Sequence, residues 1–217
     1  ARKFIDSLIK HLNIEKGLRV LDLACGAGRH SKHLEKLGFK VIGIDRSMNN
    51  IKKAKKYESS NLKFFKKEMT DDLEERFDIV LNLFTSFGYE NENYNLKTIE
   101  NISKNLKKDG ILIIDYLNYY LAEKNLVTKE TKYIEGLKFN IERYSDDKYI
   151  NKKFTVDDKN SNVYYEKVMK IDVDNFNSYC SKNNLEISKI YGNYNLDEFD
   201  IDTSERLIMI IKKSQPY

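Results

Sequence analysis

Short apolar runs alternate along the chain with stretches whose apolar residues recur at helical spacing. The runs lie at residues 20–23, 41–45, 62–65, 78–84 and 111–116. Continuous runs of this length are typical of strands buried on both faces of a parallel sheet. The stretches between them predict amphipathic helices, with apolar faces made by Leu34 and Leu37, by Met48, Ile51 and Ala54, and by Leu96, Ile99, Ile102 and Leu106. The alternation predicts an α/β domain.

The same two patterns return near the end of the chain. A further helical face is made by Val173, Phe176, Tyr179 and Cys180. Residues 185–191 and 206–211 then read as the last two strands, which brings the expected strands of the sheet to seven. Gly38 is expected to end the first of the central helices with a left-handed cap, and residues 108–110 to close the helix that carries Leu96.

Between these regions the period changes to two. Residues 139–142, 149–156 and 163–169 alternate apolar and polar positions, and residues 157–162 read as a turn. We therefore expect an antiparallel β insertion at residues 131–171, after the fifth strand. The remaining segments, 1–130 and 172–217, would form the core domain. The insertion is expected to cover the substrate site.

A helical pattern also precedes the first strand. Its apolar residues are Phe4, Ile5, Leu8, Ile9 and Leu12. The sequence leaves two interpretations open, a helix that simply packs on the core and a lid over a bound ligand.

The stretch VLDLACGAGRH, residues 20–30, carries the strongest chemical signal. A strand breaks into Gly26 and Gly28 and then into a helix, an arrangement that predicts a nucleotide-binding loop. A dinucleotide motif would have a third glycine where Ser31 stands, and a P-loop would have Gly-Lys-Ser/Thr after the glycines. The negative charge of Asp22 would be repelled by a pyrophosphate, but it would attract a ligand with a cationic amine.

The second apolar run ends in an acid. Asp45 follows Gly28 at about the distance expected for a carboxylate that binds a ribose diol. The alternative role, capping the next helix, is less favoured because Ser47 is available for it.

Two segments resemble a known family. LDLACGAGRH, residues 21–30, resembles the first motif of class I S-adenosylmethionine-dependent methyltransferases, in particular the small-molecule-type branch. NLFTSFGY, residues 82–89, resembles the segment that ends that branch's fourth strand. The resemblance implies a doubly wound, Rossmann-like, seven-stranded and mostly parallel sheet whose last two strands form a hairpin. It also implies S-adenosylmethionine as the cofactor.

The resemblance assigns a set of cofactor-binding residues: Asp22, Ala24, Cys25, Gly26, Gly28, Asp45, Arg46, Glu68, Met69, Asn82, Leu83 and Phe84. Glu68 would lie near the adenine amino group, where the family usually has Asp. Residues 85–89 would line the reacting site, although a surface loop with incidental aromatic residues is the alternative. No metal site is expected.

Methyl transfer from a sulfonium is an in-line displacement, so positioning and exclusion of water matter more than a covalent nucleophile. If a general base is used, His30 and Tyr89 are the candidates. Residues 82–85 lack the paired prolines of enzymes that methylate base amines, and neither cysteine follows a proline as in pyrimidine-carbon methyltransferases. The expected acceptor is therefore an N or O atom of a small molecule. A non-catalytic nucleotide-binding or regulatory module and an NAD-dependent oxidoreductase are the alternatives.

The composition indicates which classes of binding partner to expect. The net charge is +4 over 217 residues, and the lysine pairs are interspersed with acids, whereas nucleic-acid binding would need a concentrated basic stripe. Cys25 and Cys180 make no disulfide framework, and no apolar run approaches a membrane span. We expect a cytoplasmic monomer or homodimer that acts on a small-molecule substrate.

Overall fold

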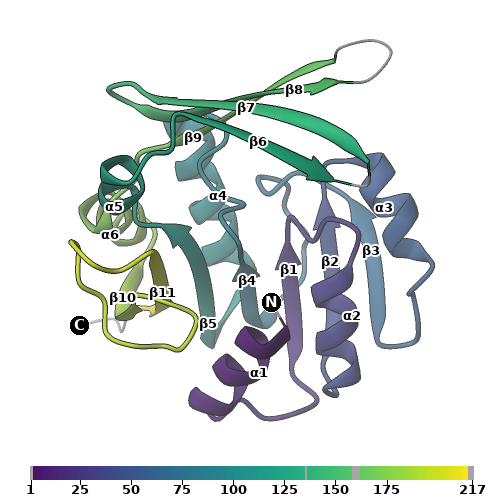
Figure 1. Ribbon diagram of the computed structural model, residues 1–217. Helices are drawn as coiled ribbons and strands as arrows, with labels where there is room; N and C mark the ends of the chain where they lie inside the picture. The colour runs from purple at the N-terminus through teal and green to yellow at the C-terminus, as the bar shows by residue number, and fades with distance from the viewer. Residues whose placement is uncertain (1, 135, 158–161, 215–217) are drawn as a thin grey trace.

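The computed structural model describes residues 2–134, 136–157 and 162–214, and Figure 1 shows their arrangement as a helix-covered sheet with a second sheet above it. The larger sheet has seven strands in the order β10-β11-β5-β4-β1-β2-β3. Its strands are β1 (Arg19–Leu23), β2 (Lys40–Asp45), β3 (Leu62–Lys66), β4 (Phe77–Asn82), β5 (Leu106–Leu117), β10 (Leu185–Tyr191) and β11 (Arg206–Lys213). The pairs among β1 to β5 are parallel, and β11 is antiparallel to both of its neighbours. The seven-stranded, mostly parallel sheet with a final hairpin is confirmed.

Helices cover both faces of this sheet. The described helices are α1 (Arg2–His11), α2 (Arg29–Lys36), α3 (Met48–Lys55), α4 (Glu92–Asn105), α5 (Tyr119–Lys124) and α6 (Val173–Ser181). One apolar cluster joins the sheet to α1, α2 and α3, and the other joins it to α4 and α6. The chain runs outward from β1 to β2 and β3, then returns to β4 and β5 on the other side. In such sheets ligands bind where the strand order reverses, which is here the carboxyl ends of β1 and β4.

The boundary between α4 and β5 differs from the expectation. The helix ends at Asn105, and Leu106 already has extended backbone and pairs with Phe77 of β4. The pairing then shifts register, and Gly110 packs so tightly in this irregular segment that a Cβ there would lie 2.9 Å from the Leu106 side chain. Residues 108–110 therefore belong to β5 and do not close the helix.

The insertion is a separate antiparallel sheet. Its strands are β6 (Lys129–Ile134), β7 (Leu137–Ser145), β8 (Tyr149–Asp157) and β9 (Val163–Met169), paired in that order. It begins shortly before the expected segment 131–171 because β6 pairs with β7 from Lys129 onward. The expected turn at 157–162 falls largely outside the described residues. Figure 1 shows this sheet lying across the carboxyl ends of the central strands.

The amino-terminal helix packs on the core. Phe4, Ile5 and Leu8 are nearly inaccessible to solvent and belong to the same apolar cluster as β1 and β4. Phe4 also contacts the ring of Phe84, with centroids 6.1 Å apart. These contacts fit the interpretation of a packed helix. In the described part of the chain, no helix is long and apolar enough to cross a membrane.

Candidate active site

The glycine loop connects β1 to α2. Gly26 and Gly28 have φ values of +57° and +77°, and Gly28 is the N-cap residue of α2. A Cβ at Gly28 would lie 2.6 Å from Cζ of Phe64, whereas one at Gly26 would meet nothing within 4 Å. Gly28 is therefore required by the packing of the loop against β3. Gly26 leaves the loop open on the side that faces the neighbouring cavities.

Asp22 is a buried carboxylate at the end of β1. Its Oδ2 atom accepts a hydrogen bond of 2.5 Å from the Ser31 hydroxyl, and the residue is only 3% exposed. Burial raises the pKa of Asp22 to about 6, an effect that the Ser31 hydrogen bond partly offsets. The serine in place of a third glycine is thus the partner of this acid. No cation pairs with Asp22 among the described residues.

Asp45 at the end of β2 organises the loops around it. It accepts hydrogen bonds from the backbone N–H groups of Gly26 at 2.9 Å and Ser47 at 2.8 Å, and from the Asn50 side chain at 3.2 Å. Ser47 caps α3, as the sequence suggested, which leaves Asp45 free of that task. A carboxylate has about four acceptor positions, so Asp45 retains capacity for one more donor.

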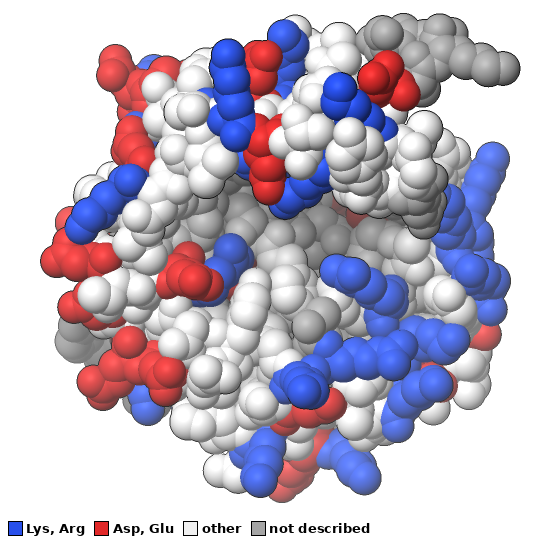
Figure 2. All heavy atoms as spheres, in the orientation of Figure 1, with Lys and Arg blue, Asp and Glu red and all other residues white. Residues whose placement is uncertain are grey.

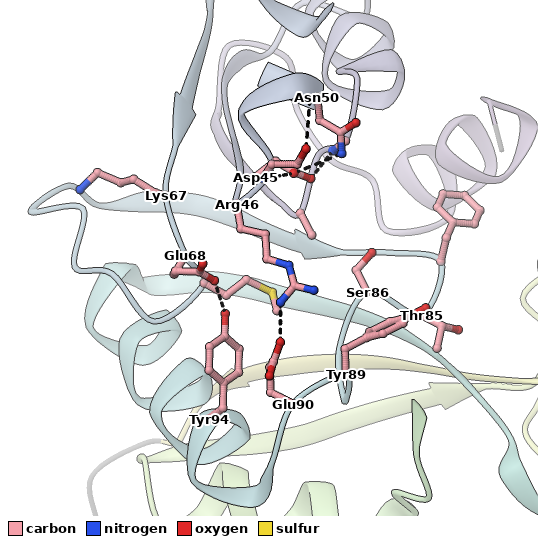
Figure 3. A pocket seen from close by; sticks show the side chains of 15 residues that line it. Asp45, Arg46, Asn50, Lys67, Glu68, Thr85, Ser86, Tyr89, Glu90 and Tyr94 are labelled. Carbon is pink, nitrogen blue, oxygen red and sulfur yellow. Dashed lines mark hydrogen bonds and ion pairs between the residues drawn. The ribbon is translucent and has the colours of Figure 1, made fainter. Parts of the chain in front are cut away.

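A cavity of about 370 Å³ opens between the ends of β2, β3 and β4 (Figure 3). Its volume falls within the range of small-molecule sites. Across it, Arg46 forms an ion pair with Glu90, and the Tyr94 hydroxyl donates to Glu68 at 2.8 Å. The lining residues are Ala24, Gly26, Asp45, Arg46, Ser47, Asn50, Lys67, Glu68, Met69, Phe84, Thr85, Ser86, Tyr89, Glu90 and Tyr94.

A second cavity of about 350 Å³ lies on the other side of the glycine loop. It is lined by Asp22, Leu23, Ala24, Cys25, Gly26, Ala27, Arg29, His30, Leu83, Phe84 and Ser86. Four of these residues, Ala24, Gly26, Phe84 and Ser86, also line the first cavity. The two cavities are therefore adjacent and form an elongated cleft from Asp22 to Glu68.

The two candidate bases lie in different parts of this cleft. His30 stacks on Phe84 with a centroid distance of 4.7 Å, and its Nε2 atom accepts a hydrogen bond from Arg29 at 3.1 Å. Burial lowers the pKa of His30 to about 4, with Arg29 adding to the effect, so the ring is neutral at pH 7. Burial raises the pKa of Tyr89, and Glu166 contributes, so this hydroxyl stays protonated. The two side chains therefore offer a neutral imidazole in one cavity and a hydroxyl donor in the other.

The sequence model of a family described as a methyltransferase domain matches residues 14–184. The chain belongs to this methyltransferase-domain family. Residues 14–184 of this methyltransferase domain include β1 to β5, all four strands of the insertion and α6.

Individual relatives agree on the family and differ in their acceptors. The methyltransferase domain is 35% identical over 136 residues to a glycine/sarcosine N-methyltransferase of Aphanothece halophytica, covering 59% of this chain and 51% of the relative. It is 36% identical over 121 residues to a ubiquinone biosynthesis O-methyltransferase of Bradyrhizobium diazoefficiens, covering 54% of this chain and 46% of the relative. The chain thus spans about half the length of these curated relatives.

Solved structures match the fold more completely. An S-adenosylmethionine-dependent methyltransferase from Clostridium acetobutylicum superposes with a TM-score of 0.83 at 19% identity, over 99% of this chain and 91% of that one. The sugar N-methyltransferase KedS8 from Streptoalloteichus gives a TM-score of 0.75 at 14% identity, over 99% and 87% of the two chains. At these identities the likeness is one of fold.

The structure brings most of the predicted methyltransferase residues to the cleft. The first cavity includes Ala24, Gly26, Asp45, Arg46, Glu68, Met69, Phe84 and Tyr89, and the second adds Asp22, Cys25, His30 and Leu83. Gly28 faces Phe64, and Asn82 is fully buried with its amide near the Met69 sulfur, so neither lines either of these two cavities. Within the expected reacting segment 85–89, Phe87 packs in the apolar core.

Several cavity residues had no signal in the sequence. Tyr94 reaches the first cavity from the first turn of α4, and Glu90 reaches it from the loop before that helix. Both residues lie in a polar stretch of the sequence, and the periodicity of this stretch does not predict which side chains would line a cavity. Their positions follow from how α4 docks on the sheet, so only the fold reveals them.

We expect the two glycines of the loop to respond differently to alanine. Gly28→Ala should lower the free energy of unfolding by about 2–4 kcal/mol, because overpacking against Phe64 adds to the strain of a positive φ. Gly26→Ala serves as the matched control, since it carries only the left-handed backbone cost of about 1–2 kcal/mol. Urea unfolding curves of both variants measure the difference. Equal losses would contradict the packing role of Gly28.

Proposed function

We propose that the chain is an S-adenosylmethionine-dependent methyltransferase that transfers a methyl group to an N or O atom of a small-molecule acceptor. The observation that carries the proposal is the order of carboxylates along the cleft: Asp22 at one end, Asp45 in the middle and Glu68 at the other end. This order matches the amine, ribose and adenine amino groups of the cofactor. Family membership supports the same reaction.

The residues of the cleft fit such a ligand. Asp22 is buried without a cationic partner among the described residues, so an ammonium group beside it would relieve the cost of ionisation. Gly26 has open space where a Cβ would stand, which allows close approach to the backbone. Asp45 has acceptor capacity left for a ribose hydroxyl. When bound, the cofactor would supply an electrophilic methyl group on a sulfonium.

The acceptor site is proposed to lie under the insertion. A third cavity, of about 190 Å³, is lined by Thr85, Leu117, Arg143, Ile150, Lys152, Glu166 and Val168. Thr85 also lines the first cavity, so the third cavity adjoins the cofactor cleft. Figure 2 shows the hollow between the insertion sheet and the core. The charged walls, where Lys152 pairs with Glu166 at 3.0 Å, suit a small polar acceptor.

Catalysis in this site would rest on orientation and exclusion of water. The Tyr89 hydroxyl, which stays protonated, would donate a hydrogen bond to the acceptor. His30 would serve mainly to support Phe84, because its ring is stacked there and Arg29 occupies its Nε2 atom. An acceptor with a free lone pair, such as a neutral amine, needs no base before transfer. One of the two relatives is named an N-methyltransferase and the other an O-methyltransferase, so we propose either an N or an O acceptor for this chain.

The two cysteines are free, and burial raises the pKa of the Cys25 thiol, which keeps it protonated. Free buried thiols are consistent with a reducing cytoplasm. We propose a cytoplasmic monomer or homodimer without nucleic-acid partners.

The first test is binding of S-adenosylhomocysteine, measured by isothermal titration calorimetry against NAD. The intact chain is expected to bind S-adenosylhomocysteine and not NAD, because Asp22 favours an amine and disfavours a pyrophosphate. Binding of NAD alone would overturn the proposed function.

The raised pKa of Asp22 predicts that the affinity for S-adenosylhomocysteine depends on pH, which the same calorimetric titration can measure. The pKa of Asp22 is about 6, so affinity for S-adenosylhomocysteine should be level above pH 6 and fall about tenfold per pH unit below it. Asp22→Asn should remove this dependence and weaken binding at neutral pH. A wild-type affinity that is unchanged at pH 5 would contradict the role of Asp22.

The stability of the ligand-free protein should fall as pH rises, whereas its affinity for S-adenosylhomocysteine should increase. A raised pKa means that the unfolded state binds fewer protons between pH 4 and 6, so stability falls as pH rises through that window. At pH 7 the buried, ionised Asp22 lowers the free energy of unfolding by on the order of 3 kcal/mol relative to its value below pH 4. Asp22→Asn, which removes the buried charge, should therefore unfold at a higher temperature than the wild type at pH 7.

The insertion offers a test of the acceptor site. Replacing residues 129–167 with a short Gly/Ser linker leaves the anchoring hydrogen bond from Met169 N–H to the Gly88 carbonyl. We expect affinity for S-adenosylhomocysteine to stay within about tenfold, or roughly 1.4 kcal/mol. Transfer of radiolabelled methyl groups to acceptors that the intact chain methylates should be lost. Loss of cofactor binding by a folded shortened chain would assign the insertion to the cofactor instead.

A further inference from the structure

The turn that follows β4 has an unusual backbone. Phe84 and Thr85 both have positive φ, at +59° and +55°, although neither is glycine. Two successive residues in the left-handed region are strained and persist only when their surroundings hold them. Phe84 lines both cofactor cavities, and Thr85 lines the first cavity and the acceptor cavity. The strain is therefore located where cofactor and acceptor would meet.

One buried residue on the neighbouring strand holds both turn residues. Asp115 of β5 is fully inaccessible to solvent. Its Oδ2 atom accepts the backbone N–H of Phe84 at 2.8 Å, and its carbonyl accepts the N–H of Thr85 at 2.9 Å. The Tyr194 hydroxyl also donates to Oδ2, at 3.2 Å.

Arg206 of β11 completes the arrangement from the other side of β5. Its Nε atom donates to Oδ1 of Asp115 at 2.8 Å, and one terminal nitrogen donates to the Thr85 hydroxyl at 2.8 Å. Because the Thr85 oxygen accepts from Arg206, its own proton is free to be donated elsewhere. Arg206 thus fixes Asp115 and the Thr85 side chain at once.

Stability alone does not account for this ion pair. β5 and β11 are already joined by a continuous antiparallel ladder from Arg206 to Lys212. A buried ion pair is a poor device for stability, because apolar residues of similar volume often stabilise a fold as well or better. Its distinguishing consequence here is the conformation of the Phe84–Thr85 turn.

We propose that Asp115 and Arg206 are positioning residues that hold the strained Phe84–Thr85 turn between the cofactor and the acceptor. The pair fixes the wall of the cofactor cleft at Phe84 and aims the Thr85 hydroxyl toward the acceptor cavity. This inference rests on the proposed methyltransferase function.

The test separates positioning from stability with S-adenosylhomocysteine as the probe. In Asp115→Leu alone, Arg206 loses its partner, so both the melting temperature and the affinity should fall. In the double variant Asp115→Leu/Arg206→Met, the melting temperature should rise above that of the single variant because no unpaired charge is left. Its affinity should remain at least about tenfold below wild type, because Phe84 N–H has lost its acceptor. Wild-type affinity in the double variant would overturn the inference.

Two further variants keep the test decisive. Arg206→Lys keeps the charge but cannot reach Asp115 and Thr85 with a fork of donors, so it should fold and bind several-fold more weakly. Unchanged affinity in this variant would also overturn the inference. Asp78→Asn is the control: Asp78 pairs with Lys107 and accepts the Arg19 N–H at the opposite end of the sheet. This variant should lose stability and keep its affinity.

The outcomes also separate this inference from the proposed function. If the wild type binds no S-adenosylhomocysteine, the proposed function fails. If the wild type binds it and either the double variant or Arg206→Lys binds it with wild-type affinity, only the inference fails.

Discussion

The structure depends on one electrostatic constraint, the burial of carboxylates near the carboxyl ends of its central strands. Asp22, Asp45 and Asp115 stand near the ends of β1, β2 and β5, and each is less than 10% exposed. An ionised group withdrawn from water must find donors or opposite charge. Each acid meets this need with a different set of partners.

Asp45 and Asp115 take several donors from within the protein, although burial still raises the pKa of Asp115. Asp45 takes its donors from the glycine loop and the start of α3, and Asp115 takes them from the strained turn, from Tyr194 and from Arg206. Both acids therefore fix loops. Among the described residues, Asp22 has Ser31 alone as its hydrogen-bond partner, and burial raises its pKa to about 6. In the proposed function, two fixed walls would stand beside one carboxylate that gains from binding a cation, which would be a trade of stability for function.

The sequence predicted the sheet because its central strands are buried on both faces and read as continuous apolar runs. The start of β5 was mistaken because Leu106 continues the helical period of Ile99 and Ile102, and only its pairing with Phe77 decides the matter. The short helix α5 has no buried residue, so the sequence carries no periodic signal that would predict it. Phe87 was expected in the reacting site, but its ring packs against Phe176 in the core.

The candidate site followed a similar division. Asp22 and Asp45 lie near the ends of strands. Their positions were predictable because the apolar runs predict where those strands end. Glu90 and Tyr94 depend on the docking of α4, and Arg206 is 91 positions away from the Asp115 it contacts. Pairing across that separation is set by the order of β5 and β11 in the sheet, which local periodicity does not encode.

In the proposed function, three carboxylates along one cleft contact three parts of a single ligand. A crystal structure of the chain with S-adenosylhomocysteine would test this arrangement. We expect the ligand's ammonium group beside Asp22, a ribose hydroxyl within hydrogen-bonding distance of Asp45, and the adenine amino group on the side of Glu68. A ligand bound in the reverse direction, or outside the two adjoining cavities, would contradict it.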